Sequence, residues 1–332
     1  MTIGPLSNVL DWALDLTTLG YSWVGYRARD LHWSEAVDGD RMRGRVAVVT
    51  GASSGIGEAT CEGLAAAGAD VVMVVRDRDR GAEARDRIAR RLGSAGRPGT
   101  LELELCDLAD LESVRALAGR LNGRDRGIAL LVNNAGVLPS QRERAPGDFE
   151  LTFATNALGP FTLTELLLPA LRRDAPARVV NVSSGGMYLA RLDPGDPQLE
   201  RRSYSGTRFY AHTKRIGVVM TEMWAEREAG SGIEFHAMHP GWVETRGLSE
   251  WLPRFRRVMD RLLRDARQGA DTTVWLGTTP ELPGRSGDFW HDRRVRPTHR
   301  LPKTRETAAE REALWGELWR LAGLEGVEGG RR

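Results

Sequence analysis

Lysine and cysteine are scarce in this sequence of 332 residues. Arginine supplies almost all of the positive charge, and Lys214 and Lys303 are the only lysines. The two cysteines, Cys61 and Cys106, exclude a disulfide-rich scaffold and favour buried, reduced thiols, as in a cytoplasmic protein. The N-terminal region lacks a signal-peptide pattern, and its uncharged stretch at 16–26 is shorter than the about 20 apolar residues of a membrane-spanning helix.

The charges nearly cancel. Lysine and arginine number 47 against 45 aspartates and glutamates, which leaves a net charge of +2. So small an excess of positive charge argues against a nucleic-acid partner. The hydrophobic fraction of 41% is ordinary for a globular protein with a sizeable core. We therefore expect a globular protein that neither binds nucleic acid nor spans a membrane.

From Arg45 onward, strand-like and helix-like segments alternate. Strands joined by helices form a parallel sheet that is covered on both faces. This predicts a Rossmann-type, doubly wound α/β domain over residues 44–302, with a helical extension at 1–43 and a C-terminal helix and tail at 303–332. The predicted strands are 46–50, 71–75, 101–106, 129–132, 178–182, 233–238 and 289–291. The predicted helices include 58–67, 110–121, 149–171, 209–227 and 308–321.

The extension at 1–43 has two interpretations. Apolar residues at helical spacing predict a helix that packs on the body of the protein or on a partner subunit, and they are Leu6, Val9, Leu10, Ala13 and Leu16. Five aromatic residues favour a weak membrane-surface contact instead, and they are Trp12, Tyr21, Trp23, Tyr26 and Trp33. Asp11 and Asp15 oppose binding to anionic lipid.

A glycine-rich turn follows the first predicted strand. Residues 50–57 read Thr-Gly-Ala-Ser-Ser-Gly-Ile-Gly and open the next helix. Gly51 permits a tight turn, Gly55 lets the backbone approach a pyrophosphate, and Gly57 allows close helix packing. Phosphates would then lie at a helix N-terminus, where free N–H groups and the helix dipole favour anions. The strand before and the helix after supply the context that a dinucleotide site requires.

Three residues separate Gly51 from Gly55, and this spacing resembles the TGxxxGxG pattern of the short-chain dehydrogenase/reductase family. Other motifs of that family follow in order, namely NNAG at 133–136, a serine pair at 183–184, YxxxK at 210–214 and Pro-Gly at 240–241. The resemblance covers residues 44–302, and several stretches are similar to the dehydrogenase/reductase member twelve branch and to retinol-dehydrogenase-like members. It implies a cofactor site made of Gly51, Ser53, Ser54, Gly55, Ile56, Gly57, Arg76, Asp107, Leu108, Asn133, Ala135, Gly136, Tyr210, Lys214, Pro240, Gly241, Val243 and Thr245.

The end of the second predicted strand bears on the choice of cofactor. An acidic residue there would bond the ribose 2′-hydroxyl of NAD, whereas this chain has Val75 followed by Arg76 and by two further arginines. The guanidinium fork suits phosphate oxygens. We therefore predict NADP(H), held mainly by Arg76, with NAD(H) as the alternative. A solvated basic helix start, partly offset by nearby aspartates, is the other interpretation of these arginines.

Tyr210 and Lys214 lie four residues apart on a predicted helix and therefore on one face. Tyrosine, with an ordinary pKa near 10, is a weak acid–base group at neutral pH, and a nearby ammonium lowers that pKa. Such a pair suits proton transfer to a carbonyl oxygen whose carbon receives a hydride. The rival, Tyr204, is followed four residues on by Arg208 rather than by a lysine.

The resemblance implies four catalytic residues, which are Ser184, Tyr210, Lys214 and Asn156. Ser184 would hold the substrate oxygen, Tyr210 would transfer the proton, and Lys214 would also bind the nicotinamide ribose. Asn156 would help to organise a water-linked proton path, and Ser183 is the alternative serine. The predicted function is hydride transfer between a nicotinamide and a carbonyl or alcohol substrate. The alternative is a catalytically silent dinucleotide-binding sensor or scaffold protein.

Two segments bear on the substrate and on partners. The polar segment 190–207 predicts a loop over the site, and an apolar stripe in 248–263 predicts either a lid or part of the core. A lid of this kind implies an apolar, lipid-like, retinoid-like or steroid-like small molecule. A homo-oligomer also stays open, because members of the resembled family often pair through the tyrosine-bearing helix. No metal site is expected, because His236 and His239 would point to opposite faces of a strand.

Overall fold

The chain is built around one eight-stranded sheet. The computed structural model describes residues 11, 14, 17–31, 33, 41–93, 98–244, 259–280, 282 and 285–325. Its strands are β1 (Val46–Thr50), β2 (Asp70–Val75), β3 (Leu101–Leu105), β4 (Leu130–Asn133), β5 (Ala177–Val182), β6 (Ile233–Met238), β7 (Phe289–His291) and β8 (Arg294–Arg296).

The strand order is β3-β2-β1-β4-β5-β6-β7-β8, and every pair is parallel except β7 with β8. The order reverses between β1 and β4, which is the topological switch point where ligands bind in open α/β sheets. The predicted doubly wound α/β fold is thereby confirmed. The antiparallel hairpin that adds β8 was not predicted, because a strand of three residues is too short to show a period of two.

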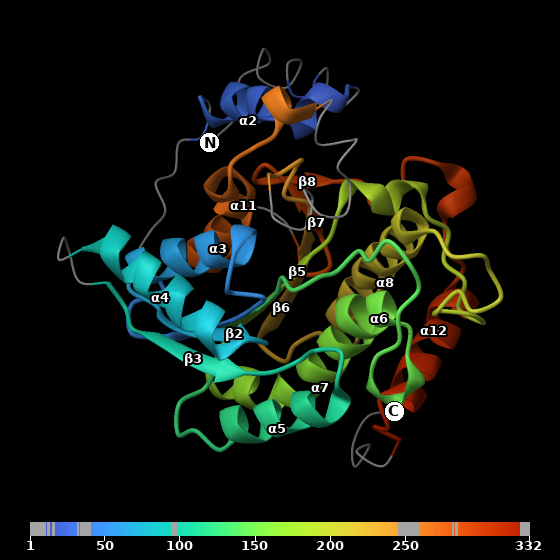
Figure 1. Cartoon of the computed structure of the whole chain (residues 1–332), viewed down its shortest axis with the longest axis horizontal. Coiled ribbons are helices and arrows are strands. Elements are labelled where there is room, and N and C mark those ends of the chain that lie inside the picture. Colours follow the sequence, from blue (N-terminus) through green and yellow to red (C-terminus); the bar gives the residue numbers. More distant parts are fainter. Residues whose placement is uncertain are drawn as a thin grey trace.

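Helices cover both faces of the sheet (Figure 1). One face carries α3 (Gly55–Ala66), α4 (Arg78–Leu92) and α11 (Ala266–Thr278), and the other carries α5 (Leu111–Asn122), α7 (Gly159–Arg173) and α8 (Gly206–Arg227). Within the described residues, no helix has the length and apolar character that crossing a membrane would require.

The single helix predicted over 149–171 is interrupted. It consists of the short α6 (Leu151–Phe153), a π-helical turn at Ala154–Leu158, and α7. The interruption leaves the apolar periodicity nearly unchanged, so the sequence could not reveal it. It matters for function because Asn156 lies inside the π-helical turn, and π-helical turns often mark functional sites.

The C-terminal helix α12 (Ala308–Leu321) packs on the body of the protein, as predicted. Its Trp315 meets Phe161 of α7 edge-on, with ring centroids 5.1 Å apart, and approaches Trp224 of α8 at 5.8 Å. Arg215 of α8 pairs with Glu306, which lies just before α12. The C-terminal region therefore covers part of the surface of α8, the helix that bears Tyr210 and Lys214.

The N-terminal extension contributes the short helix α2 (Trp23–Asp30), which lies beyond the β7–β8 end of the sheet (Figure 1). Sequence reasoning placed its helix at residues 6–16 instead. Of that segment only Asp11 and Leu14 are described, so most of that prediction lies outside the described residues. Both cysteines are buried free thiols, as expected.

Candidate active site

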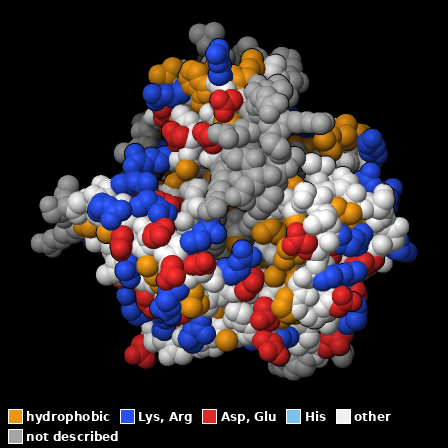
Figure 2. Space-filling model, viewed as in Figure 1, with side chains coloured by type: hydrophobic (Ala, Val, Ile, Leu, Met, Phe, Trp, Pro, Cys, Tyr) orange, Lys and Arg blue, Asp and Glu red, His pale blue; other side chains and the backbone are white. Residues whose placement is uncertain are grey.

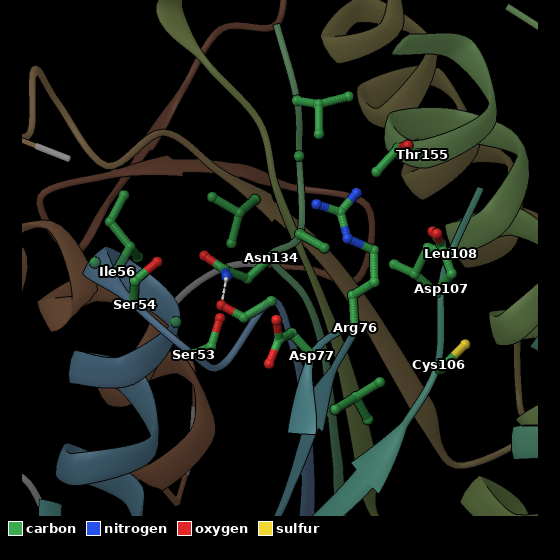
Figure 3. Close-up of a pocket in the computed structure, with 18 of the residues that line it drawn as sticks. Ser53, Ser54, Ile56, Arg76, Asp77, Cys106, Asp107, Leu108, Asn134 and Thr155 are labelled. Carbon is green, nitrogen blue, oxygen red and sulfur yellow. Dashed lines mark hydrogen bonds between the residues drawn. The ribbon is translucent and has the colours of Figure 1, made fainter. Parts of the chain in front are cut away.

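A cleft of about 400 Å³ opens at the carboxyl ends of the strands beside the switch point. Its walls come from the glycine-rich loop after β1, from the ends of β2 and β3, and from the turn after β4 (Figure 3). The end of β5 and the first half of α8 close it. Every strand end that forms the cleft carries one of the motifs identified in the sequence.

The glycine-rich loop needs its glycines. Gly51 has a φ of +67°, and a Cβ there would lie 2.9 Å from the Cα of Ala135. A Cβ on Gly57 would lie 2.3 Å from the carbonyl oxygen of Gly51. Any larger residue would therefore push the loop, α3 and the turn after β4 apart.

Asn134 fastens this loop to the turn after β4. Its side-chain Nδ2 donates to the carbonyl oxygen of Thr50 at 2.8 Å, and Figure 3 shows the same amide pointing at the loop. The Thr50 hydroxyl in turn accepts the backbone N–H groups of Asn134 and Ala135 at 3.0 and 3.1 Å. Sequence reasoning did not count Asn134 among the site residues.

The N-terminus of α3 is open toward the cleft. The N-cap residue Ser54 makes no side-chain hydrogen bond to the first turn, although serine commonly caps a helix in this way. The Ser54 side chain therefore leaves the first backbone N–H groups of α3 available to donate to an anion. The helix dipole also favours negative charge there. This geometry fits a pyrophosphate.

Arg76 and Arg80 line the cleft at the end of β2. Figure 3 shows the Arg76 side chain reaching into the cavity between Asn134 and Asp107. The carboxylate of Asp77, also at the cleft, accepts the backbone N–H of Arg80 at 3.0 Å and caps α4. Because the Asp77 carboxylate serves the helix N-terminus, the two arginines present a cationic surface that suits a phosphate.

Tyr210 and Lys214 lie together on α8. The Lys214 Nζ is 5.5 Å from the centre of the Tyr210 ring and donates to the carbonyl oxygen of Val182 at 2.8 Å. Lys214 is buried, with 6% of its surface exposed. The ammonium has three N–H donors, so two remain for a bound ligand once Val182 is satisfied.

The two serines after β5 differ in their surroundings. Ser183 is buried, and its hydroxyl donates to the carbonyl oxygen of Lys214 at 3.0 Å. Ser184 instead has its side chain in hydrogen-bonding contact with Tyr210 and accepts the backbone N–H of Gly186 at 3.2 Å. Ser184, rather than Ser183, therefore contacts the phenol, whereas Ser183 and not Ser184 is part of the cleft lining.

Burial determines the proton affinity of both catalytic candidates. It raises the pKa of Tyr210 to about 12, and the hydrogen bond with Ser184 only partly opposes this rise. It lowers the pKa of Lys214 to about 8. The expectation that Lys214 lowers the pKa of Tyr210 is therefore not met, since burial of the phenol outweighs any effect of the ammonium. In this form Tyr210 holds its proton at neutral pH.

Asn156 is held mainly by the backbone of Val137, which directly follows the Asn-Asn-Ala-Gly turn. Its Oδ1 accepts the Val137 N–H at 2.8 Å, and its Nδ2 donates to the Val137 carbonyl oxygen at 2.9 Å and to the Thr213 hydroxyl at 3.2 Å. A small cavity of about 10 Å³ borders both Asn156 and Lys214. That volume is near the minimum that one water molecule needs.

Most of the predicted cofactor residues meet at the cleft. Those that line it are Gly51, Ser53, Ser54, Gly55, Ile56, Gly57, Arg76, Asp107, Leu108, Ala135, Gly136, Tyr210, Lys214 and Pro240. Three other described residues of the predicted set are not part of this lining, and they are Asn133, Gly241 and Val243. Asn133 lies beneath it, where its Nδ2 donates to Asn181 at 2.8 Å and to Thr164 at 3.0 Å. Thr245 lies outside the described residues.

The segment 190–207, predicted as a loop, is a loop as far as residue 205, and its last two residues begin α8. The loop is tied to its neighbours, since Asp193 N–H donates to Nε2 of His212 at 3.1 Å and Arg142 pairs with Glu200 at 2.9 Å. The described part of the chain holds no cluster of three acidic, histidine or cysteine side chains that could bind a metal ion. Most of the predicted lid falls outside the described residues, and only its last five residues, 259–263, are described.

Comparison with known proteins points to one family. Residues 45–254 match the family model described as short chain dehydrogenase. The chain is 40% identical over 284 residues to dehydrogenase/reductase SDR family member 12 of Bos taurus, covering 85% of this chain and 87% of that protein. It is 34% identical over 259 residues to retinol dehydrogenase 11 of Mus musculus, covering 76% and 79%. A solved structure of an uncharacterized protein from Mycobacterium paratuberculosis has a TM-score of 0.67 at 30% identity, covering 86% of this chain and 97% of that one.

Proposed function

This chain belongs to the short-chain dehydrogenase/reductase family, and we propose that it is an NADP(H)-dependent oxidoreductase acting on a carbonyl or alcohol. One observation carries the proposal. Tyr210 and Lys214 line the β5 side of a cleft whose β2 side presents Arg76 and Arg80, and Ser184 is in hydrogen-bonding contact with Tyr210. A cleft of this form can hold a dinucleotide at one side and protonate a substrate at the other.

Different groups of the protein would bind different parts of NADP(H). The N–H groups at the start of α3 would hold the pyrophosphate, Arg76 and Arg80 the 2′-phosphate, and Lys214 the nicotinamide ribose. NADP(H) bound there supplies the hydride chemistry, which no side chain of the protein can supply. A NAD-dependent enzyme would place an acidic group at the 2′-hydroxyl, whereas here Arg76 directly follows β2 and lines the cleft, and the Asp77 carboxylate accepts the Arg80 N–H through Oδ1.

The chemical step uses the protonated form of Tyr210. During carbonyl reduction the phenol would donate its proton to the substrate oxygen, and the Ser184 hydroxyl would hold that oxygen beside it. Lys214 and Asn156 border the small internal cavity, so a water there could return a proton toward Tyr210. In the alcohol-oxidising direction the same groups act in reverse.

The substrate proposed is apolar and lipid-like, retinoid-like or steroid-like. Support comes from the apolar stripe predicted over 248–263 and from the similarity to retinol dehydrogenase 11. The experiment is a panel of carbonyl compounds with NADPH, ordered from small polar aldehydes to long-chain and polycyclic ketones. Turnover confined to the small polar members would contradict this substrate class but not the proposed reaction.

A catalytically silent sensor or scaffold is the second candidate. It would keep the nucleotide cleft and have no need for Ser184 beside Tyr210 or for Asn156 beside Lys214. The structure contains both pairs, and this favours the enzyme. Binding of NADPH without turnover of any member of the carbonyl panel would favour the sensor.

We further propose that the protein works in the cytoplasm with a weak contact to a membrane surface. Four of its exposed large apolar residues lie in the N-terminal segment, and they are Leu19, Trp23, Val24 and Leu31. Figure 2 shows hydrophobic side chains gathered at the top of the molecule, where Figure 1 places α2. A homo-oligomer that pairs through α8, as members of the family often do, would need a part of α8 that α12 leaves uncovered. Light scattering in solution measures the oligomeric state.

A further inference from the structure

The N-terminal segment 17–31 is bound into the catalytic domain by its backbone. The carbonyl oxygen of Tyr21 accepts the N–H of Trp242 at 2.8 Å, just after the Pro240-Gly241 turn. The carbonyl oxygen of Gly20 accepts from Arg29 at 2.9 Å and from Arg264 at 3.0 Å. The bonds from Trp242 and Arg264 join the segment to the region that follows β6, whereas the bond from Arg29 lies within the segment. Pro240, also in the region after β6, lines the cofactor cleft.

A buried charge network fixes the same segment. Asp292, which is 1% exposed, accepts from Arg29 at 2.6 Å and from both terminal nitrogens of Arg264 at 2.6 and 2.8 Å. Asp11 pairs with Arg29 at 2.7 Å and with Arg296 of β8 at 2.8 Å. Removing one partner of such a network strands a buried charge, so the segment cannot leave without a large cost.

Tyr21 places its ring against His239. The two ring centroids are 4.8 Å apart with an interplanar angle of 72°, and His291 stacks on the same imidazole at 4.8 Å and 22°. His239 is 3% exposed, and burial together with His291 holds its pKa well below the ordinary value. The imidazole is therefore neutral.

The imidazole in turn holds the turn that contains Ser184. His239 Nδ1 accepts the backbone N–H of Gly185 at 3.1 Å, and Gly185 directly follows Ser184. The opposite nitrogen, Nε2, has no hydrogen-bond partner among the described residues. With one hydrogen bond to orient it, the His239 ring depends on Tyr21 and His291 for its position.

We propose that segment 17–31 completes the active site and that Tyr21 is a positioning residue for Ser184. Tyr21 acts through His239, which aligns the Gly185 amide and with it the Ser184 hydroxyl beside Tyr210. The expected effect on turnover rests on the proposed oxidoreductase function. The expected effect on the position of the turn at Ser184 and Gly185 does not depend on that function.

The test compares Tyr21→Ala, Tyr21→Phe and Leu19→Ala in the full chain. Leu19 is the matched control, since it lies on the same segment with 46% of its surface exposed. NADPH affinity and the thermal midpoint are measured first, to identify any variant that fails to fold. We then measure, for each variant, hydrogen–deuterium exchange of the peptide covering 183–190 and kcat with the carbonyl compound of the panel that the wild-type protein reduces best.

We expect Tyr21→Ala to keep NADPH affinity, to lower kcat roughly tenfold through misplacement of Ser184, and to speed amide exchange in 183–190. Tyr21→Phe, which keeps the ring, should restore both properties, and Leu19→Ala should leave both unchanged. Unchanged exchange in 183–190 on Tyr21→Ala, or an equal effect of Leu19→Ala, would overturn the inference. If Tyr21→Ala does not fold, an unchanged exchange rate in His239→Leu would overturn it instead. If the wild-type protein turns over no carbonyl compound, the proposed function is overturned. The hydrogen–deuterium exchange of 183–190 then decides this inference alone.

Discussion

Lys214 Nζ lies 5.5 Å from the centre of the Tyr210 ring and donates to the carbonyl oxygen of Val182. The ammonium is thus held by the end of β5, the strand that also leads to Ser184. Two hydrogen bonds therefore join α8 to the end of β5, this one and the bond from the Ser183 hydroxyl to the Lys214 carbonyl oxygen. The predictions below begin from this arrangement.

Tyr210→Phe should lower kcat for carbonyl reduction by roughly 10²-fold or more, because it removes the proton donor and little else. NADPH affinity should stay near the wild-type value. Tyr204→Phe is the control, since the Tyr204 hydroxyl donates to the carbonyl oxygen of Pro139 and Tyr204 is not part of the cleft lining. Steady-state kinetics decide the question, and unchanged kcat in Tyr210→Phe would contradict the proposed mechanism.

Arg76→Ala should weaken NADPH binding by roughly tenfold to a hundredfold, the range for loss of a charged hydrogen bond, and should change NADH binding little. The exposed Arg78→Ala is the matched control, since Arg78 is close in sequence and is not part of the cleft lining. Fluorescence titration of both nucleotides measures the dissociation constants. An equal loss of affinity for NADH and NADPH would show that Arg76 does not bind the 2′-phosphate.

The stability of the protein should depend on the titration of Lys214. Its pKa falls from the ordinary 10.5 to about 8 in the folded protein because it is buried. Between these pH values the unfolded chain binds a proton that the folded chain has released, so this group's contribution to stability rises with pH. Relative to Lys214→Met, the wild-type free energy of unfolding should rise by on the order of 3 kcal/mol from pH 8 to pH 10.5.

Lys303→Met is the control for this measurement, because Lys303 is exposed and is the only other lysine. Both variants keep Tyr210, whose raised pKa acts in the opposite direction above pH 10, so its effect cancels in the comparison. Urea unfolding at several pH values gives the free energies. Parallel pH profiles for wild type and Lys214→Met would show that the ammonium is not buried.

Asp292→Asn should destabilise the protein by about 3–5 kcal/mol, because Arg29 and Arg264 would lose their shared buried carboxylate. Asp148→Asn should change stability little, since the Asp148 side chain is 87% exposed. Chemical denaturation compares the two. If Asp292→Asn lowers the free energy of unfolding as little as Asp148→Asn does, other contacts must hold the N-terminal segment.

Vesicle binding should depend on the outward side of the N-terminal segment. The double variant Leu19→Ser with Trp23→Ser removes two side chains that are 46% and 42% exposed, and it should abolish flotation with phosphatidylcholine vesicles. Leu189→Ser is the control, because Leu189 is 76% exposed and lies elsewhere. Equal flotation of the wild-type protein and the double variant would refute the proposed membrane contact.

The sequence by itself determined the order of strands and helices, the glycine-rich loop, and the pairing of Tyr210 with Lys214. These features depend on local spacing, such as apolar periodicity and an interval of four residues on a helix, so they can be read without a fold. β1, β6, β7 and α12 have the bounds that the spacing predicted.

Only the tertiary structure decided that Ser184 rather than Ser183 faces Tyr210, that Asn134 holds the cofactor loop, and that Tyr21 packs on His239. Each of these depends on a contact between residues far apart in the chain. Strand register and helix rotation fix which of two adjacent side chains contacts the phenol, and here Ser184 contacts Tyr210 while Ser183 lines the cleft. Burial likewise reversed the expected direction of the Tyr210 pKa, because the cost of a buried phenolate depends on everything packed around it.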